Sequence, residues 1–193
     1  PILQTFGLVN IAQLKGVGVQ VFGIPIEQVG KVNHFPESLY RQYQHYLDMA
    51  DDKSLDLTSQ QRQALREQAA ESVKHPSFAK QLTDEQYKEA VRSYTPQASE
   101  RIVDAAPNRP GMIASIGVVD IQKDIDGKFI HRTDKLYELP ITLTVLEMSP
   151  RGGLNFPRSA TKDYWLVDDS RTKVWQYDES TVYVPFDVLQ SDM

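Results

Sequence analysis

The chain has 193 residues, of which 40% are hydrophobic and 24% are charged, and its formal net charge is −5. This composition is typical of a folded globular protein with enough residues for one core. The acidic balance argues against a nucleic-acid-binding surface, which would need a basic face. Because the chain has no cysteine, disulfides, thiolate metal sites and cysteine nucleophiles are excluded. The longest apolar runs, such as Met112–Val119, reach about half of the ~20 residues that a membrane helix needs.

The first zone, residues 1–33, has the pattern of β-strands. Val17, Val19 and Val21 alternate with smaller or polar residues, which is the period of two expected of a strand. Lys15-Gly16 is a plausible turn that joins this strand to an earlier one over Thr5–Leu14. Proline cannot donate a ladder hydrogen bond, so Pro25 is expected to end the second strand.

The second zone, residues 36–106, is expected to be helical. Apolar and tyrosine residues over Leu39–Ala50 recur at spacings of three and four. Pro76 is expected to break the long polar helix that follows. Further helix starts are expected at the capping-box patterns of Thr58 and Thr83 and at Thr95-Pro96. The zone is rich in polar side chains and is therefore interpreted as a helical lobe with much exposed surface.

The third zone, residues 110–193, returns to strands. Asp126-Gly127 predicts a turn between two short strands, Asp120–Ile125 and Lys128–His131. Ser149–Lys162, with its glycines and prolines, is expected to be a long mobile loop. Further strands are expected over Ile141–Val145, Tyr164–Val167 and Thr181–Val184. The order of strands, helices and strands predicts a single α+β domain whose mixed sheet is built from both chain ends around a largely helical inserted lobe.

The search for catalytic and metal-binding patterns predicts no catalytic, metal or cofactor residue and no enzyme. Asp124-Ile125-Asp126-Gly127 invites a calcium-loop reading, but Gln122 and Thr133 stand where the pattern needs acids, which favours a hairpin turn. His34, His45, His75 and His131 have no metal-ligand spacing. Nucleophile-elbow and phosphate-loop patterns are absent. Asp51-Asp52 and Asp168-Asp169 occur in turn-like contexts, and an acid/base pair would need one carboxyl desolvated.

Three tyrosines lie close together on the first expected helix, at Tyr40, Tyr43 and Tyr46. They suit either packing against the sheet or a patch that faces a partner, because tyrosine is favoured where one end of the side chain stays wet.

The C-terminal stretch Tyr177–Gln190 contains a recognisable pattern. Thr181–Val184 is expected to be a strand, Pro185 to stop it, and Phe186–Gln190 to begin a helix. The stretch resembles the end of the extracytoplasmic core domain of ABC transporter permeases of the MacB/LolC/LolE/FtsX type, where a similar segment closes the domain before the next membrane helix.

Further segments agree with this resemblance. Gly18–Glu27 is similar to a strand of the family that ends in a proline and an acid, and Pro110–Gly117 is similar to another short apolar segment. Leu139–Leu146 takes the place of the strand before the final hairpin. The usual glycine is absent near Tyr164–Asp169, and residues 36–106 diverge from the family.

The resemblance implies a non-catalytic domain on the extracytoplasmic side of the cytoplasmic membrane. It implies a cytoplasmic ATPase as a partner through membrane helices, and a periplasmic partner protein, a lipoprotein cargo or a cell-wall hydrolase as the molecule engaged. Since Pro1 is not an initiator methionine, we expect a processed protein or a segment of a longer one. This interpretation predicts that Pro1 and Met193 lie close together. The alternative is a free-standing periplasmic or secreted protein that binds a ligand between the helices and the sheet.

Overall fold

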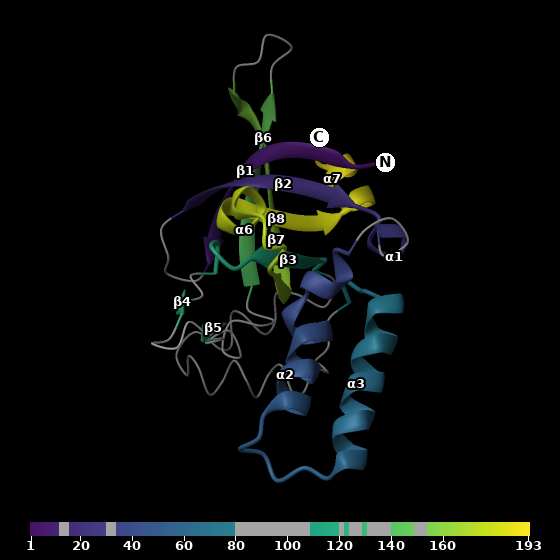
Figure 1. Ribbon diagram of the computed structural model, residues 1–193. Helices are drawn as coiled ribbons and strands as arrows, with labels where there is room; N and C mark the ends of the chain where they lie inside the picture. The colour runs from purple at the N-terminus through teal and green to yellow at the C-terminus, as the bar shows by residue number, and fades with distance from the viewer. Residues whose placement is uncertain are drawn as a thin grey trace, which may run out of the picture.

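A computed structural model describes residues 1–11, 16–29, 34–79, 109–119, 122–123, 129–130, 140–148 and 154–193. Six strands form a closed barrel in the order β1–β2–β8–β3–β7–β6, and a helical hairpin projects from it (Figure 1). The fold is therefore α+β with a mixed sheet, as expected. The closure of the sheet into a barrel was not expected.

The barrel strands are β1 (Leu3–Ile11), β2 (Val17–Ile24), β3 (Gly111–Ser115), β6 (Pro140–Met148), β7 (Leu154–Ser170) and β8 (Thr181–Pro185). The helical segments are α1 (Ile26–Val29), η1 (Pro36–Ser38), η2 (Tyr40–Gln44), α2 (His45–Asp51), α3 (Ser59–Lys74), α6 (Trp175–Ser180) and α7 (Phe186–Ser191). A separate two-stranded ladder pairs β4 (Gln122–Lys123) with β5 (Phe129–Ile130).

Strands β1 and β2 form the antiparallel pair expected from the valine alternation, with a register from Leu3↔Gly23 to Val9↔Val17. Val19 and Val21 are buried inside the barrel, because alternate side chains of a strand face opposite sides. The turn expected at Lys15-Gly16 lies largely outside the described residues.

The C-terminal strand β8 lies between β2 and β3. It pairs in parallel with β2, from Gln20↔Thr181 to Ile24↔Pro185, and antiparallel with β3. A second parallel pair joins β3 to β7. The barrel thus brings residues 20–24 against residues 181–185, although most of the chain separates them.

Apolar side chains pack on both sides of the barrel wall. The interior is filled by aliphatic residues from every strand, and Leu189 of α7 belongs to this cluster. Gly23 permits the approach of α7, since an added Cβ would stand 2.9 Å from the Leu189 side chain. A second cluster, with Ile24, Trp165 and Tyr183 among its members, packs outside the barrel against Phe35 and Leu39.

The helical hairpin begins with one turn of π-helix, η2, that continues into α2, where a plain helix over Leu39–Ala50 was expected. Helix α3 begins at the capping box of Thr58, which is confirmed, because Thr58 and Gln61 satisfy each other's backbone N–H groups. The helix ends at Lys74, just before Pro76, as expected. The starts expected at Thr83 and Thr95 lie outside the described residues.

The expectation of a mobile loop over Ser149–Lys162 was wrong from residue 154 onward. Strand β7 begins at Leu154 and pairs with β6 at Leu154 and Asn155 and again from Ala160 to Trp165. Pro157 is tolerated there because it falls between Asn155 and Ala160, where the register shifts and ladder bonds are interrupted. The outer halves of β6 and β7 extend from the barrel as an arm (Figure 1).

Three other expected strands agree with the structure. Ile141–Val145 lies in β6, Tyr164–Val167 lies in β7, and Thr181–Val184 lies in β8. The two strands expected around Asp126-Gly127 pair as β4 and β5, while the turn itself lies outside the described residues.

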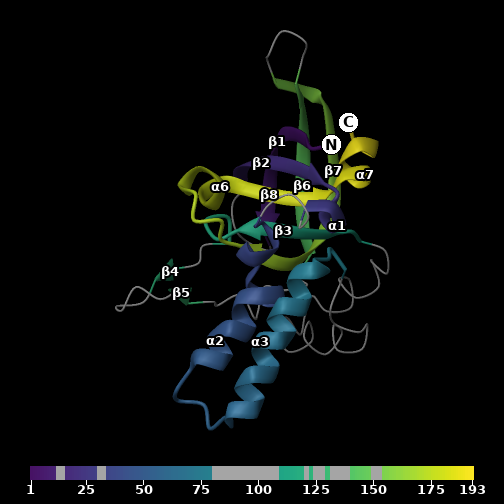
Figure 2. The ribbon, with the colours of Figure 1, turned by 45° about the vertical axis from the view of Figure 1, so that its right-hand side comes forward.

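The two chain ends lie side by side. Pro1 and Met193 are neighbours in both views, at the same side of the barrel (Figure 2). Gly23 is the point where they meet, because an added Cβ there would contact both Leu3 and Leu189. Lys162 also holds Asp192 through an ion pair of 2.7 Å.

Candidate partner-binding face

Two neighbouring parallel strands end in the same sequence pattern. Strand β2 ends in Ile24-Pro25-Ile26-Glu27 and strand β8 ends in Val184-Pro185-Phe186-Asp187, so each proline is followed by an apolar residue and an acid. Each proline ends its ladder, and a short helix, α1 or α7, begins directly after it. Since Ile24 pairs with Pro185, the two junctions stand at the same level of the barrel.

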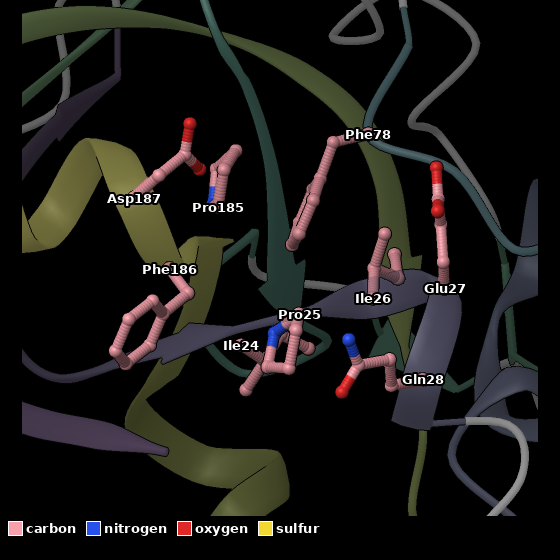
Figure 3. A pocket seen from close by; sticks show the side chains of 9 residues that line it. All are labelled: Ile24, Pro25, Ile26, Glu27, Gln28, Phe78, Pro185, Phe186 and Asp187. Carbon is pink, nitrogen blue, oxygen red and sulfur yellow. The ribbon is translucent and has the colours of Figure 1, made fainter. Parts of the chain in front are cut away.

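A crevice of about 280 Å³ lies between these junctions. Its apolar lining consists of Ile24, Pro25, Ile26, Phe78, Pro185 and Phe186. Glu27, Gln28 and Asp187 complete the lining and are exposed to solvent. The crevice therefore combines an apolar lining with a few exposed polar side chains. Phe78, from the segment after α3, reaches in between the two acids (Figure 3).

A row of aromatic rings leads away from this crevice along the outer face of β2 and β8. Phe22 stacks on Tyr183 with 5.9 Å between ring centroids, and Tyr183 contacts Phe35 at 4.5 Å. On its other side Phe22 meets the edge of Tyr177 of α6 at 6.1 Å. Phe22 is half-buried and Tyr177 is 43% exposed, so this end of the row is open to solvent.

The row ends at a turn that we call the tryptophan turn, Lys173–Trp175. Trp175 is 75% exposed and Val174 is 46% exposed. Lys173 has φ of 64°, a left-handed conformation that non-glycine residues rarely adopt. The turn therefore displays two large apolar side chains on a constrained backbone.

The side chain of Asp178 holds the tryptophan turn in place through hydrogen bonds to Thr172 and Lys173. Its carboxylate accepts hydrogen bonds from Thr172 N at 2.6 Å, from Thr172 Oγ1 at 2.8 Å and from Lys173 N at 2.9 Å. Its backbone carbonyl accepts from Gly117 N at 2.8 Å, which ties the turn to the end of β3. A side chain at residue 117 would collide with the Glu179 carbonyl, so glycine permits this close approach. These bonds hold the turn in one conformation.

A buried carboxylate, Asp168, lies where the helical hairpin meets the barrel. Its oxygens accept from Arg41 N at 2.7 Å, Gln42 N at 3.0 Å and Gln42 Nε2 at 3.0 Å. Gln42 in turn bonds both backbone groups of Ser77, just after α3. This chain of bonds joins β7 to the beginning and the end of the hairpin.

Burial is the largest effect on Asp168, and it raises the pKa of this carboxyl to about 7 together with the charge of Asp169. The hydrogen bonds from Arg41 and Gln42 act in the opposite direction. Asp168 is fully buried and does not line the crevice. Its hydrogen bonds to Arg41 and Gln42 indicate a structural role, in which Asp168 attaches the helical hairpin to the barrel.

The sequence interpretation placed Asp168-Asp169 in a turn, and this was wrong, because both residues lie in β7 and neither is exposed. The tyrosines Tyr40, Tyr43 and Tyr46 are all half-buried on the hairpin. The rings of Tyr40 and Tyr46 contact His45.

The histidines that the structure describes are not brought together. His34 pairs with the exposed Glu37, which raises the pKa of His34, and His75 lies near Glu71. His131 and the residues of the rejected calcium loop, Asp124–Gly127, lie outside the described residues. Within the described ranges, no three His, Asp or Glu side chains are grouped to hold a metal ion.

Sequence reasoning missed the crevice and the tryptophan turn. The repeated pattern of proline, apolar residue and acid after β2 and β8 was a usable signal for the crevice. Trp175 gave no signal, because its exposure depends on the bracing by Asp178.

No helix in the described part of the chain is long and apolar enough to cross a bilayer. Models of known protein families do not match the chain, and neither does any curated protein.

Proposed function

We propose that this chain is the non-catalytic extracytoplasmic domain of an ABC transporter permease of the MacB/LolC/LolE/FtsX type. In this role it couples the movement of membrane helices to the engagement of a cargo or a partner protein. ATP is hydrolysed by a separate cytoplasmic subunit or domain, which the chain reaches through membrane helices.

The placement of the two chain ends supports this proposal most. A domain inserted between two membrane helices needs both ends on one side, and Pro1 and Met193 lie together there (Figure 2). The junction from β8 through Pro185 into α7 has the form of the family's exit segment. Because α7 packs into the barrel through Leu189, a pull on the C-terminal end would act directly on the barrel core.

The working surfaces under this proposal lie away from the ends. The tryptophan turn stands at the opposite end of β8 from α7, and the helical hairpin projects from another side of the barrel (Figures 1 and 2). Under this proposal they are the surfaces that meet a lipoprotein, a cell-wall hydrolase or another periplasmic partner. The net charge of −5 gives no support to a nucleic-acid partner.

The crevice favours a second candidate, a free-standing periplasmic or secreted ligand-binding protein. Binding pockets are mostly apolar with a few polar groups, and the crevice has this character. Its volume of about 280 Å³ lies just below the range of roughly 300–1,000 Å³ for small-molecule sites, so it would hold only a small ligand.

One experiment separates the two candidates. The chain has no cysteine, so the full-length gene product is made with Lys53→Cys, an exposed position on the hairpin, and labelled in cells with a membrane-impermeant maleimide. We expect labelling from the periplasmic side and recovery of the protein in the membrane fraction. The unsubstituted full-length protein is the control for other cysteines.

Labelling only after the cytoplasmic membrane is broken would overturn the proposal. Recovery of labelled protein in the soluble periplasmic or secreted fraction would replace it with the ligand-binding candidate. The gene also gives a direct check, because the permease proposal expects an apolar stretch of ~20 residues on either side of this domain.

A further inference from the structure

The crevice between the ends of β2 and β8 places two acids around one aromatic ring. Figure 3 shows the Phe78 side chain between Glu27 on one side and Asp187 on the other. Phe78 is half-buried, so part of its ring remains accessible. The face of an aromatic ring attracts cations, and so does a carboxylate. These three side chains therefore share a preference for a positively charged ligand.

The two acids are available to such a ligand. Both are exposed, and among the described residues neither has a hydrogen-bond or ion-pair partner. They come from different strands, yet they stand at the same level of the barrel, because Ile24 pairs with Pro185 and each acid follows its proline by two positions. The crevice thus has two uncompensated carboxylates beside an apolar lining.

The rest of the lining favours an organic cation over a metal ion. Ions such as Ca²⁺ need about six or more oxygen ligands, and in the described part of the chain no three His, Asp or Glu side chains are grouped. The other lining side chains are mostly apolar and cannot replace the water around a metal ion. An ammonium that carries alkyl groups would gain both from the carboxylates and from the apolar lining.

The segment that carries Phe78 is held in place before any ligand binds. Gln42 accepts from the backbone N–H of Ser77 at 2.8 Å and donates to its carbonyl at 3.2 Å, and the same amide donates to Asp168 at 3.0 Å. Gly111 of β3 permits the close approach of this segment, because a Cβ at residue 111 would collide with the Phe78 carbonyl. A ring that is already positioned loses less entropy when a ligand binds.

We propose that the crevice binds a small organic ammonium ion. The cation lies against the Phe78 ring between Glu27 and Asp187, and its alkyl groups contact the apolar lining. The volume of about 280 Å³ limits the ligand to a small group. A free ion or the ammonium headgroup of a lipid has this chemistry. The inference goes beyond the coupling role, since it names the ligand of the crevice under either candidate function.

A titration of the chain with choline, followed by two-dimensional NMR, tests the proposal. The matched ligand is dimethylbutanol, the neutral isostere in which carbon replaces the ammonium nitrogen, so the two probes differ only in charge. We expect choline to bind with a dissociation constant on the order of 1 mM, which is reasonable for so small a ligand. The isostere should bind at least ~10-fold more weakly. The shifted amide signals should include Glu27, Gln28 and Asp187.

Two variants separate the contributions to binding. Glu27→Gln combined with Asp187→Asn keeps the shape of two exposed side chains and removes their charge, so the preference for choline over the isostere should fall to about the level of the ring alone, a few-fold. Phe78→Leu keeps an apolar side chain and removes the aromatic face, so it should weaken choline several-fold and the isostere much less. Asp56→Asn, an exposed acid on the hairpin, is the charge control and should leave both affinities unchanged.

Co-sedimentation with vesicles distinguishes the two sources of the cation. Binding to phosphatidylcholine vesicles that excess choline displaces, without binding to phosphatidylglycerol vesicles, would support the proposal with a lipid headgroup as the ligand. Choline binding without vesicle binding would support it with a free ion.

Three results would overturn the proposal. They are no choline binding up to about 20 mM, equal affinities for choline and its isostere, and an undiminished preference for choline in the variant that lacks both acids. None of these results bears on the location of the domain, which the labelling of Lys53→Cys decides.

Discussion

Asp168 places a carboxylate between two parts of the molecule that are far apart in sequence. Its oxygens bond the backbone of Arg41 and Gln42, more than 120 positions away, since the separations are 127 and 126 residues. The donors stabilise a charge at this position, while burial and Asp169 oppose it, and the pKa of about 7 shows that burial dominates. The protonation of Asp168 is therefore linked to the free energy of unfolding near neutral pH.

We predict that the free energy of unfolding of the wild type falls as pH rises, because the buried Asp168 carboxyl must lose its proton. The folded-state pKa lies above the ordinary value of 3.8, so the stabilising contribution is fully present below about pH 4 and is lost as pH rises through about 7. Compared with Asp168→Asn, the wild type should lose roughly 2–4 kcal/mol of unfolding free energy between pH 4 and 8.5. Urea unfolding of both proteins across this range measures the difference.

Parallel pH profiles for the two proteins would contradict this prediction. Asp163→Asn is a matched control, because Asp163 lies on the same strand with a partly exposed side chain.

At the residue scale, the sequence predicted features that depend only on residues close together in the chain. The capping box of Thr58 depends on residues three apart and is present. The burial of Asp168 depends on η2 packing over β7, which no local pattern around Asp168-Asp169 contains. Trp175 was missed for the same reason, because Asp178 and Gly117 determine how the turn is held.

One arginine of α3, Arg62, holds the segment that connects α2 to α3 in the helical hairpin. The Arg62 guanidinium donates to the carbonyls of Ala50 at 2.7 Å, Asp52 at 2.8 Å and Leu55 at 2.9 Å. The first two carbonyls lie at the C-terminal end of α2, where the helix leaves its last acceptors unpaired. A planar guanidinium can reach all three carbonyls at once.

Arg62→Ala should destabilise the hairpin by about 1–3 kcal/mol, because the carbonyls lose charge-assisted bonds. Arg62→Lys should recover only part of this loss, since an ammonium does not have the fork geometry. Hydrogen exchange of the α2–α3 connection and urea unfolding measure the effect. Arg66→Ala is the control, because the ion pair of Arg66 with Asp51 is exposed and such pairs contribute about 0–1 kcal/mol. Equal effects of the two alanine variants would contradict the assignment.

At the element scale, strands with clear alternation were predicted well and irregular elements were not. The β1–β2 pair and the strands within β6, β7 and β8 follow the sequence pattern. The first half of β7 was missed because Pro157 and neighbouring glycines resemble a loop. The strand exists because a register shift accommodates the proline and β6 supplies a partner.

For the molecule as a whole, the sequence predicted a mixed sheet from both chain ends but not its closure. Local alternation shows which side of a strand is buried, whereas closure depends on which strands become neighbours. The pairing of β2 with β8 joins residues about 160 positions apart, and nothing near Val21 or Val182 specifies it. The proximity of Pro1 and Met193 follows from this pairing.

Because the ends are adjacent, we expect a circular permutant to fold. A linker of about six Gly/Ser residues, which spans on the order of 13 Å, would join Met193 to Pro1, and new ends would open between Lys53 and Ser54. This permutant should unfold cooperatively, within about 2 kcal/mol of the wild type, since the opening lies in an exposed connection. New ends between Val182 and Tyr183 should abolish folding, because they interrupt β8. Loss of folding in the first permutant would show that the ends cannot be bridged. Circular dichroism during urea unfolding distinguishes these results.

The position of β8 in the barrel also determines when the protein can fold during synthesis. Its neighbours β2 and β3 are made earlier and can pair with β1 and β7, yet the edge of each that faces β8 stays unpaired until residues 181–185 leave the ribosome. Such non-local pairing is slow, and until it forms the nascent chain carries two open strand edges. Pairing of β8, the last barrel strand in chain order, is thus the step that closes the barrel, and a ribosome stalled before residue 181 would hold a barrel that cannot close.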